Sequence, residues 1–269
     1  MRNRMSDRGV VALLGVTLAV SAGLALGQGT TPAGVKEAGA VKEAGAETTG
    51  EWTVLFDGTS LDNFRGYRKG SMPEAGWELV EGTLHHKAGG GGGDIVTRGR
   101  YGDFELEFEW KVAEGANSGV FYRVSEEETA PYLTGSEYQV LDNAKHADGN
   151  NPKTSAGAIY ALYAAEKDVT KPVGEWNVAK IVVKGNTIEH WLNGEKVATA
   201  EIGSTDWNSR VAESKFKDWK KYGTKAEGHL VFQDHGDDVW YRSIRVKSAK
   251  AVEQAPKEQK PVVPAPASS

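Results

Sequence analysis

Cysteine is absent from the 269-residue sequence. This absence excludes disulfide bridges, thiolate catalysis and lipid attachment through cysteine. A strong positive charge is also lacking: the formal net charge is -5, so the chain has no basic surface of the kind that nucleic acids bind. The sequence therefore predicts a protein that is held together by an apolar core and has no nucleic-acid partner.

Long hydrophobic runs are scarce, and the clearest one occupies residues 9–27. Three arginines precede it, and it closes with the small-x-small pattern Ala25-Leu26-Gly27, which is typical of a secretory signal peptide. A membrane anchor is the alternative, since the run approaches the ~20 residues that span a bilayer. The cleavage pattern favours removal of residues 1–27. We therefore expect a periplasmic or secreted protein without a stable membrane anchor.

Two further segments lack the pattern of a folded domain. Residues 28–50 contain the hexapeptide VKEAGA twice in tandem, too few copies to stack a core, which predicts a disordered linker. Residues 251–269 are rich in proline and alanine, which predicts a disordered tail. The remaining residues, 51–250, are enough for one domain with a substantial core.

Short alternating runs separated by Gly, Asn, Asp and Pro dominate this domain. In DFELEFEWKV, residues 103–112, apolar and charged side chains alternate, which is typical of a half-buried strand. Similar runs include GAIYALY at 157–163, while residues 206–219 look helical with Asp206 or Asn208 as N-cap. Many antiparallel strands in one domain must close or pair into two sheets. We predict an all-β, two-sheet antiparallel jelly-roll sandwich with one short helix.

The first polar constellation is GANSGVFYR, residues 115–123. Asn117 and Arg123 have the same parity, which would place an amide and a guanidinium on one side of a strand. Such a pair suits sugar hydroxyls or a developing oxyanion. An ordinary turn with an exposed arginine is the alternative.

The second constellation is GSEYQVLD, residues 135–142. Glu137 and Gln139 share one face, and a bulge could add Asp142 to them. The spacing Glu-x-Gln-x-x-Asp is similar to the Glu-x-Asp-x-x-Glu strand of laminarinase-type glucanases. Retaining glycosidases need two carboxyl groups about 5 Å apart, and Gln139 cannot ionise. Conventional hydrolysis through Glu137 and Asp142 stays open, but the strand does not favour it.

The third constellation lies in HLVFQDHGDDVWYRSIRV, residues 229–246. Leu230 and Phe232 should face the core, which turns Gln233 and His235 to the other side. Polar groups are costly to bury without partners, so these two should line a polar cleft or join a satisfied network. A histidine suits proton transfer near neutral pH. A structural role is the alternative.

Six segments in order, from WTVLFDGTSLDNF through GANSGVFYR, EYQVLD, SAGAIYALY and EWNVAKIVVKGNTIEHWLNGEKV to GHLVFQDHGDDVWYRSIRVK, resemble the 3-keto-disaccharide hydrolase domain family, formerly a domain of unknown function. The match runs from about Trp52 to Lys247, and Ala116 stands where glycine is frequent. The resemblance implies a concanavalin A-like lectin/glucanase jelly roll, export to the periplasm or cell surface, and cleavage of glycosides that carry a ketone at C3.

A ketone at C3 acidifies the proton on C2, so the C1 bond can break by elimination followed by addition of water. That route needs a base near C2, a donor to the enolate oxygen and an acid near the glycosidic oxygen. We assign His235 or Glu137 as base or acid, with Asp142 as a further catalytic candidate. The substrate-binding candidates are Asn117, Arg123, Gln139, Gln233, Glu109, Tyr160 and Trp191.

The sequence requires no cofactor, although a divalent cation could polarise the ketone. Its candidate ligands are Glu137, Asp142, His146 and His235. Fold alone does not decide function, so a non-catalytic carbohydrate-binding domain and a structural domain of the cell envelope are the alternatives to an enzyme. A concave pocket with titratable groups would favour the enzyme, and a shallow aromatic platform would favour binding.

Overall fold

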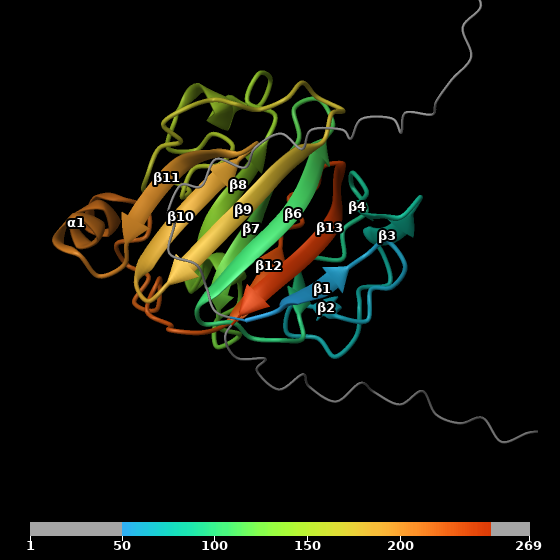
Figure 1. Ribbon diagram of the computed structural model, residues 1–269, viewed down its shortest axis with the longest axis horizontal. Coiled ribbons are helices and arrows are strands. Elements are labelled where there is room, and N and C mark those ends of the chain that lie inside the picture. The colour runs from blue at the N-terminus through green and yellow to red at the C-terminus, as the bar shows by residue number, and fades with distance from the viewer. Residues whose placement is uncertain (1–49, 249–269) are drawn as a thin grey trace, which may run out of the picture. The chain divides into compact units, whose positions relative to one another are not determined.

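The computed structural model describes residues 50–248, which form two antiparallel β-sheets (Figure 1). The larger sheet has the order β11-β10-β9-β6-β13-β4-β3, with β1 paired to β13, and the smaller sheet has the order β2-β5-β12-β7-β8. Apolar side chains from both sheets meet in one core. This architecture confirms the predicted all-β, two-sheet antiparallel jelly-roll sandwich.

The larger sheet consists of β1 (Trp52–Phe56), β3 (Trp77–Val80), β4 (Thr83–His86), β6 (Phe104–Val112), β9 (Asn177–Lys184), β10 (Thr187–Leu192), β11 (Glu195–Glu201) and β13 (Val239–Ser248). The smaller sheet consists of β2 (Phe64–Gly66), β5 (Ile95–Thr97), β7 (Asn117–Val124), β8 (Ser136–Leu141) and β12 (His229–Phe232). Two short 3-10 helices, which the sequence analysis did not predict, are η1 (Pro131–Leu133) and η2 (Ala147–Asn150).

Strand β6 shows how alternation builds the core. Its charged side chains face outward, and its apolar ones are buried. The large buried side chains are Phe104, Leu106, Phe108 and Trp110. Phe108 meets Tyr138 of the smaller sheet edge to face, with ring centroids 5.7 Å apart. Edge-to-face pairs of this kind add stability beyond the apolar area that they bury, so the aromatic residues also help to align the two sheets.

A two-residue turn, Asn193-Gly194, joins β10 and β11. Asn193 and Gly194 have φ values of 49° and 87°. A two-residue hairpin turn with positive φ at both positions matches the twist of its strands, and asparagine and glycine adopt it at low cost. The residue types at these two positions therefore fit the turn that they form.

The segment GAIYALY does not form the strand that its apolar residues suggested. Gly157 and Ala161 have φ values of 83° and 60°, and this left-handed backbone interrupts an extended chain. Ile159 instead forms isolated bridges with Tyr138 and Tyr163. The segment therefore lies along the edge of β8 as a loop, and it brings a tyrosine, Tyr160, to the outer face of the smaller sheet.

The predicted short helix is present as α1 (Thr205–Glu213), but its N-cap differs from the expected one. The Ser204 hydroxyl oxygen accepts a hydrogen bond from Trp207 N at 3.1 Å. Serine in this position satisfies a backbone N–H that the first turn leaves free. The cap is therefore Ser204 and not Asp206 or Asn208.

The predicted signal peptide at 1–27, most of the predicted linker at 28–50 and the predicted tail at 251–269 lie outside the described residues. Their roles, and the expected export, stay predictions. Within residues 50–248, no helix is long and apolar enough to cross a bilayer.

Candidate active site

A polar pocket lies on the outer face of the smaller sheet. In β8, Tyr138 and Val140 belong to the core, so Glu137 and Gln139 point the other way. The pocket has a volume of about 380 Å³, within the size range of small-ligand sites. It is lined by Asp94, Asn117, Tyr132, Glu137, Gln139, Tyr160, Lys215, Trp219, Gln233, Asp234 and His235.

Glu137 is almost fully buried in this pocket. Burial raises its pKa to about 8, because the carboxylate would lose its hydration, and Asp94 adds to the shift while Lys215 opposes it. The side chain therefore carries a proton at neutral pH. Gly119 on the neighbouring β7 makes room for it, since a Cβ at that position would overlap with the Glu137 carboxyl group.

Three side-chain amides, those of Asn117, Gln139 and Gln233, line the same pocket as this carboxyl group. Gln139 Nε2 donates a hydrogen bond to Asn117 Oδ1 at 3.1 Å, and Asn117 N donates to Asp237 Oδ2 at 2.9 Å. The Oε1 atoms of Gln139 and Gln233 are buried, and each lacks a hydrogen-bond donor among residues 50–248. An unpaired buried acceptor costs about 1–3 kcal/mol. These two atoms therefore favour a ligand that brings hydroxyl groups.

Asp94 and Asp234 form a second acidic group in the pocket. Asp234 N donates to Asp94 Oδ1 at 2.9 Å, and the Asp234 carboxylate lies 2.8 Å from His86 Nε2. Burial raises the pKa of Asp94 to about 6, and the charge of Asp234 adds to this shift. Asp94 is not among the residues predicted from the sequence. Its parity with Val96, whose side chain faces away from the main core, is the signal that would have placed it.

His235 follows β12, and its exposed side chain lines the pocket. Its ring centroid lies 6.4 Å from that of His146. His146 Nδ1 accepts a hydrogen bond from Asp148 N, and Asp148 Oδ2 accepts one from the Tyr160 hydroxyl at 3.0 Å. Burial and this carboxylate raise the pKa of Tyr160. The turn after β8 thus places a second imidazole beside the first.

Tyr132 and Trp219 form an aromatic side of the pocket, with ring centroids 5.4 Å apart. Lys215 also lines it and holds Nζ 4.3 Å above the Tyr160 ring, a favourable cation–π arrangement. Burial lowers the pKa of Lys215, whereas Glu137 opposes that shift. Three of these lining residues were not predicted from the sequence: Tyr132, Lys215 and Trp219. They come from η1 and the segment after α1, where no strand alternation marks a side chain as facing the pocket.

Most of the predicted site residues therefore meet in one pocket. Those that line it are Asn117, Glu137, Gln139, Tyr160, Gln233 and His235, and His146 lies beside it.

Arg123 does not reach this pocket. Its φ is 53°, and a bulge in β7 makes Val124, rather than Arg123, share a face with Phe121. The guanidinium group instead donates to Gly102 O at 3.1 Å and Gly185 O at 2.8 Å. Arg123 is a buried structural residue, in contrast to the prediction from parity.

Three other candidates also lie elsewhere. Asp142 lines a different pocket, and its carboxylate accepts a hydrogen bond from Gly115 N at 2.7 Å. Glu109 is paired with Arg242 at 2.6 Å on the outer face of the larger sheet. Trp191 belongs to β10 of the same sheet. Asp142 thus follows β8 but lines another pocket, and Glu109 and Trp191 belong to the larger sheet, so none of the three lines the pocket of the smaller sheet.

The candidate ligands of a divalent cation do not converge. Across residues 50–248, no three side chains of His, Asp or Glu are arranged as a metal site. Asp142 accepts backbone hydrogen bonds with both carboxylate oxygens, and His146 Nδ1 accepts one from Asp148. The predicted set of Glu137, Asp142, His146 and His235 is therefore not a coordination sphere.

Comparison with known proteins identifies a family. Residues 51–247 match the family described as the 3-keto-alpha-glucoside-1,2-lyase-like domain. The chain is 35% identical over 226 residues to a 3-keto-disaccharide hydrolase of Bacteroides thetaiotaomicron, covering 73% of this chain and 78% of the relative. Two crystal structures from Parabacteroides distasonis, each provisionally named a glycosyl hydrolase, are also similar. The first is 32% identical, with a TM-score of 0.68, and the match covers 74% of this chain and 94% of that structure's chain. The second is 28% identical, with a TM-score of 0.59, and the match covers 74% of this chain and 99% of that structure's chain.

Proposed function

Since the chain belongs to the 3-keto-alpha-glucoside-1,2-lyase-like family, we propose that it cleaves glycosides whose sugar carries a ketone at C3, in the pocket of the smaller sheet. The relative from Bacteroides thetaiotaomicron is named for such a substrate. The observation that carries the proposal is that one pocket contains both the buried, protonated Glu137 and the buried Oε1 acceptors of Gln139 and Gln233, which have no donor in the described part of the chain.

The ketone makes a route through the C2 proton available. A base removes this proton, the electron pair of the C2–H bond forms a C1–C2 double bond, and the C1–O bond breaks. The glycosidic oxygen keeps the electron pair of that bond and takes a proton from an acid. Addition of one water then places OH on C1 and H on C2, so the net reaction is hydrolysis. Two proton-transfer groups suffice: one takes the proton from C2, and the other gives a proton to the glycosidic oxygen.

Glu137 suits the role of the acid. An ordinary carboxylate has already lost its proton at neutral pH, whereas burial keeps this one protonated. Its proton would go to the departing glycosidic oxygen. The backbone of Gly119 allows the carboxyl group to lie close to β7, which fixes its position relative to a sugar on the pocket floor.

His235 suits the role of the base. An imidazole accepts a proton readily near neutral pH, and this one lines the same pocket as Glu137. Asn117, Gln139 and Gln233 would hold the ketone and the hydroxyl groups through their amides, because amides both donate and accept. The sugar thereby supplies the donors that the two Oε1 atoms lack.

The test uses paired substrates. We expect the protein to cleave methyl 3-ketoglucoside and to leave methyl glucoside intact, because without the ketone the C2 proton is not acidic. His235→Ala and Glu137→Gln should each lower kcat/KM for the ketone at least about 100-fold, the usual size of an acid or base contribution. Product formation by chromatography measures both.

His85→Ala is the matched control. His85 stacks on Trp240 with ring centroids 4.6 Å apart, on the larger sheet and away from the pocket, so kcat/KM should stay within about twofold. Equal cleavage of both sugars would contradict the ketone route. Binding of the ketone without cleavage would identify a carbohydrate-binding domain instead.

A further inference from the structure

The pocket is polar at its floor and aromatic at its rim. Gln139 and Asn117 are 1% and 4% exposed, whereas Tyr132 is 44% exposed. Glu137 and these two amides are therefore deep, whereas the His235 side chain and the large Tyr132 ring are exposed. A ligand that fills the floor with one sugar must extend any further group past this ring.

The rim ring belongs to an aromatic stack that reaches into the core. Tyr132 packs on Trp219, Trp219 lies 5.0 Å from Phe216, and Phe216 stacks on Tyr222 at 4.2 Å between centroids. Phe216 and Tyr222 are buried. The inner rings thus support the outer ones, which leaves the Tyr132 and Trp219 rings presented to the pocket as a supported apolar surface.

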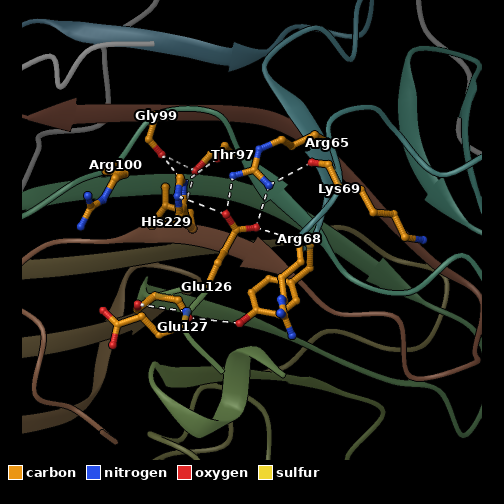
Figure 2. A network of polar contacts seen from close by, with 12 residues as sticks. Arg65, Arg68, Lys69, Thr97, Gly99, Arg100, Glu126, Glu127 and His229 are labelled. Carbon is orange, nitrogen blue, oxygen red and sulfur yellow. Dashed lines mark hydrogen bonds and ion pairs between the residues drawn. The ribbon is translucent and has the colours of Figure 1, made fainter. Parts of the chain in front are cut away.

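The loop that joins β7 to η1, and so leads to Tyr132, is held near its start by contacts of Glu126 (Figure 2). Both Glu126 carboxylate oxygens accept hydrogen bonds from Arg65 at 2.7 Å, and Arg68 N donates to the same carboxylate at 2.6 Å. The Tyr67 hydroxyl donates to Ser125 O at 3.1 Å. A bidentate arginine pair of this kind restricts geometry as well as adding energy. The loop before Tyr132, the first residue of the aromatic wall that Tyr132 and Trp219 form, is therefore held in place.

The segment that carries Trp219 is tied to the same loop. Gly223 N donates to Thr134 O at 2.9 Å, and Lys221 Nζ lies 2.9 Å from Glu128 Oε1. The segments that carry Tyr132 and Trp219 are thus joined by a backbone hydrogen bond and an ion pair. A preformed wall loses little conformational entropy when a ligand binds to it.

We infer that Tyr132 and Trp219 form the subsite for the leaving group of the glycoside, and that this subsite takes a second sugar ring. The inference rests on the proposed cleavage, because it places the oxidised sugar on the floor beside Glu137. The glycosidic oxygen then lies within reach of the Glu137 carboxyl group, and the departing ring extends from it toward the opening, against the aromatic pair. The apolar face of a sugar ring fits an aromatic surface, and its hydroxyl edges remain free for water.

The experiment compares two 3-keto substrates that differ in the leaving group, methyl 3-ketoglucoside and a 3-keto-disaccharide. Tyr132→Ala and Trp219→Ala should each lower kcat/KM for the disaccharide about tenfold, chiefly through KM, because one stacking contact is lost. The methyl glycoside, which does not reach the wall, should keep its kcat/KM within about twofold.

Trp176→Ala is the matched control, because Trp176 lies against Lys111 and Arg242, which belong to the larger sheet. It should change neither substrate. If Trp219→Ala fails to fold, as a thermal melt would show, Tyr132→Ala decides, since that side chain is largely exposed. Equal losses on both substrates, or none on the disaccharide, overturn the subsite but not the cleavage. If the unaltered protein cleaves neither substrate, the proposed function fails and the subsite with it.

Discussion

At the residue scale, Glu137 combines a cost for folding with a use in catalysis. Its carboxyl group has an ordinary pKa of 4.5, and burial raises it to about 8. The folded protein therefore binds this proton more tightly than the unfolded chain does. The tighter binding of this proton stabilises the folded state, and the stabilisation is fully present below about pH 4.5. It is lost as the pH rises through about 8, because the folded state then loses the proton and must hold a buried charge.

Glu137→Gln should therefore stabilise the protein in alkali while it removes the catalytic proton. We expect its free energy of unfolding to exceed that of the unaltered protein by at least about 1 kcal/mol at pH 9, the equivalent of one pKa unit, and by less at pH 5. Denaturant titrations at the two pH values measure this. The kcat/KM of the unaltered protein should fall as the pH rises through about 8, because kcat/KM reports the pKa of the ligand-free protein.

Glu127→Gln provides a contrast. Hydrogen bonds from Lys225 and Lys221 lower the pKa of the exposed Glu127 to about 2, so that substitution should bring no gain in alkali. The contrary outcome is that the gain in free energy of unfolding of Glu137→Gln over the unaltered protein is no larger at pH 9 than at pH 5. It would show that Glu137 is ionised in the folded state at neutral pH. The assignment of Glu137 as the acid would then be wrong.

At the scale of the element, β7 owes its role in the site to one missing side chain. Gly119 pairs with Gln139 of β8, and the Glu137 carboxyl group lies over it. Glycine is usually unfavourable in a strand because it packs nothing, but it permits a close approach. Here the approach sets the position of the acid.

Gly119→Ala should displace the Glu137 carboxyl group and lower kcat for methyl 3-ketoglucoside about tenfold or more, since a small misplacement of a catalytic group is costly. The alkaline limb of the pH profile should move to lower pH, because the displaced carboxyl group is better hydrated. In the double variant with Glu137→Gln, the second substitution should add little further loss. Additive losses, or an unshifted alkaline limb, would mean that Gly119 does not position Glu137.

Regular strands explain which part of the site could be predicted from the sequence. Glu137 and Gln233 follow the alternation of β8 and β12, so parity alone turned them away from the core. Parity failed at Arg123, because the bulge in β7 inserts a residue that no local pattern announces. It could not find Tyr132 and Trp219, since long-range packing of two loops brings them together. The fold needed only the alternation, whereas the site also depends on these irregular segments.

At the scale of the whole described domain, the outer faces of the two sheets differ. The larger sheet displays ion pairs such as Glu109 with Arg242, of which the arginine side chain is 40% exposed. Exposed pairs contribute about 0.2–1 kcal/mol. The smaller sheet carries the pocket, and Arg123 fastens that sheet to the larger one by donating to carbonyls in the turns before β6 and after β9. These two arginines therefore have unequal importance for stability.

Arg123→Ala should lower the free energy of unfolding by about 2–4 kcal/mol, because two carbonyls lose a charged donor in a largely buried position. Arg242→Ala, the matched substitution on the larger sheet, should cost less than about 1 kcal/mol. Denaturant titrations measure both, and KM for methyl 3-ketoglucoside should stay within about twofold in each protein while it is folded. A raised KM in Arg123→Ala with unchanged stability would instead restore the substrate-binding role that strand parity predicted. Because the guanidinium group is held by Gly102 and Gly185 rather than by pocket residues, the loss should appear in stability.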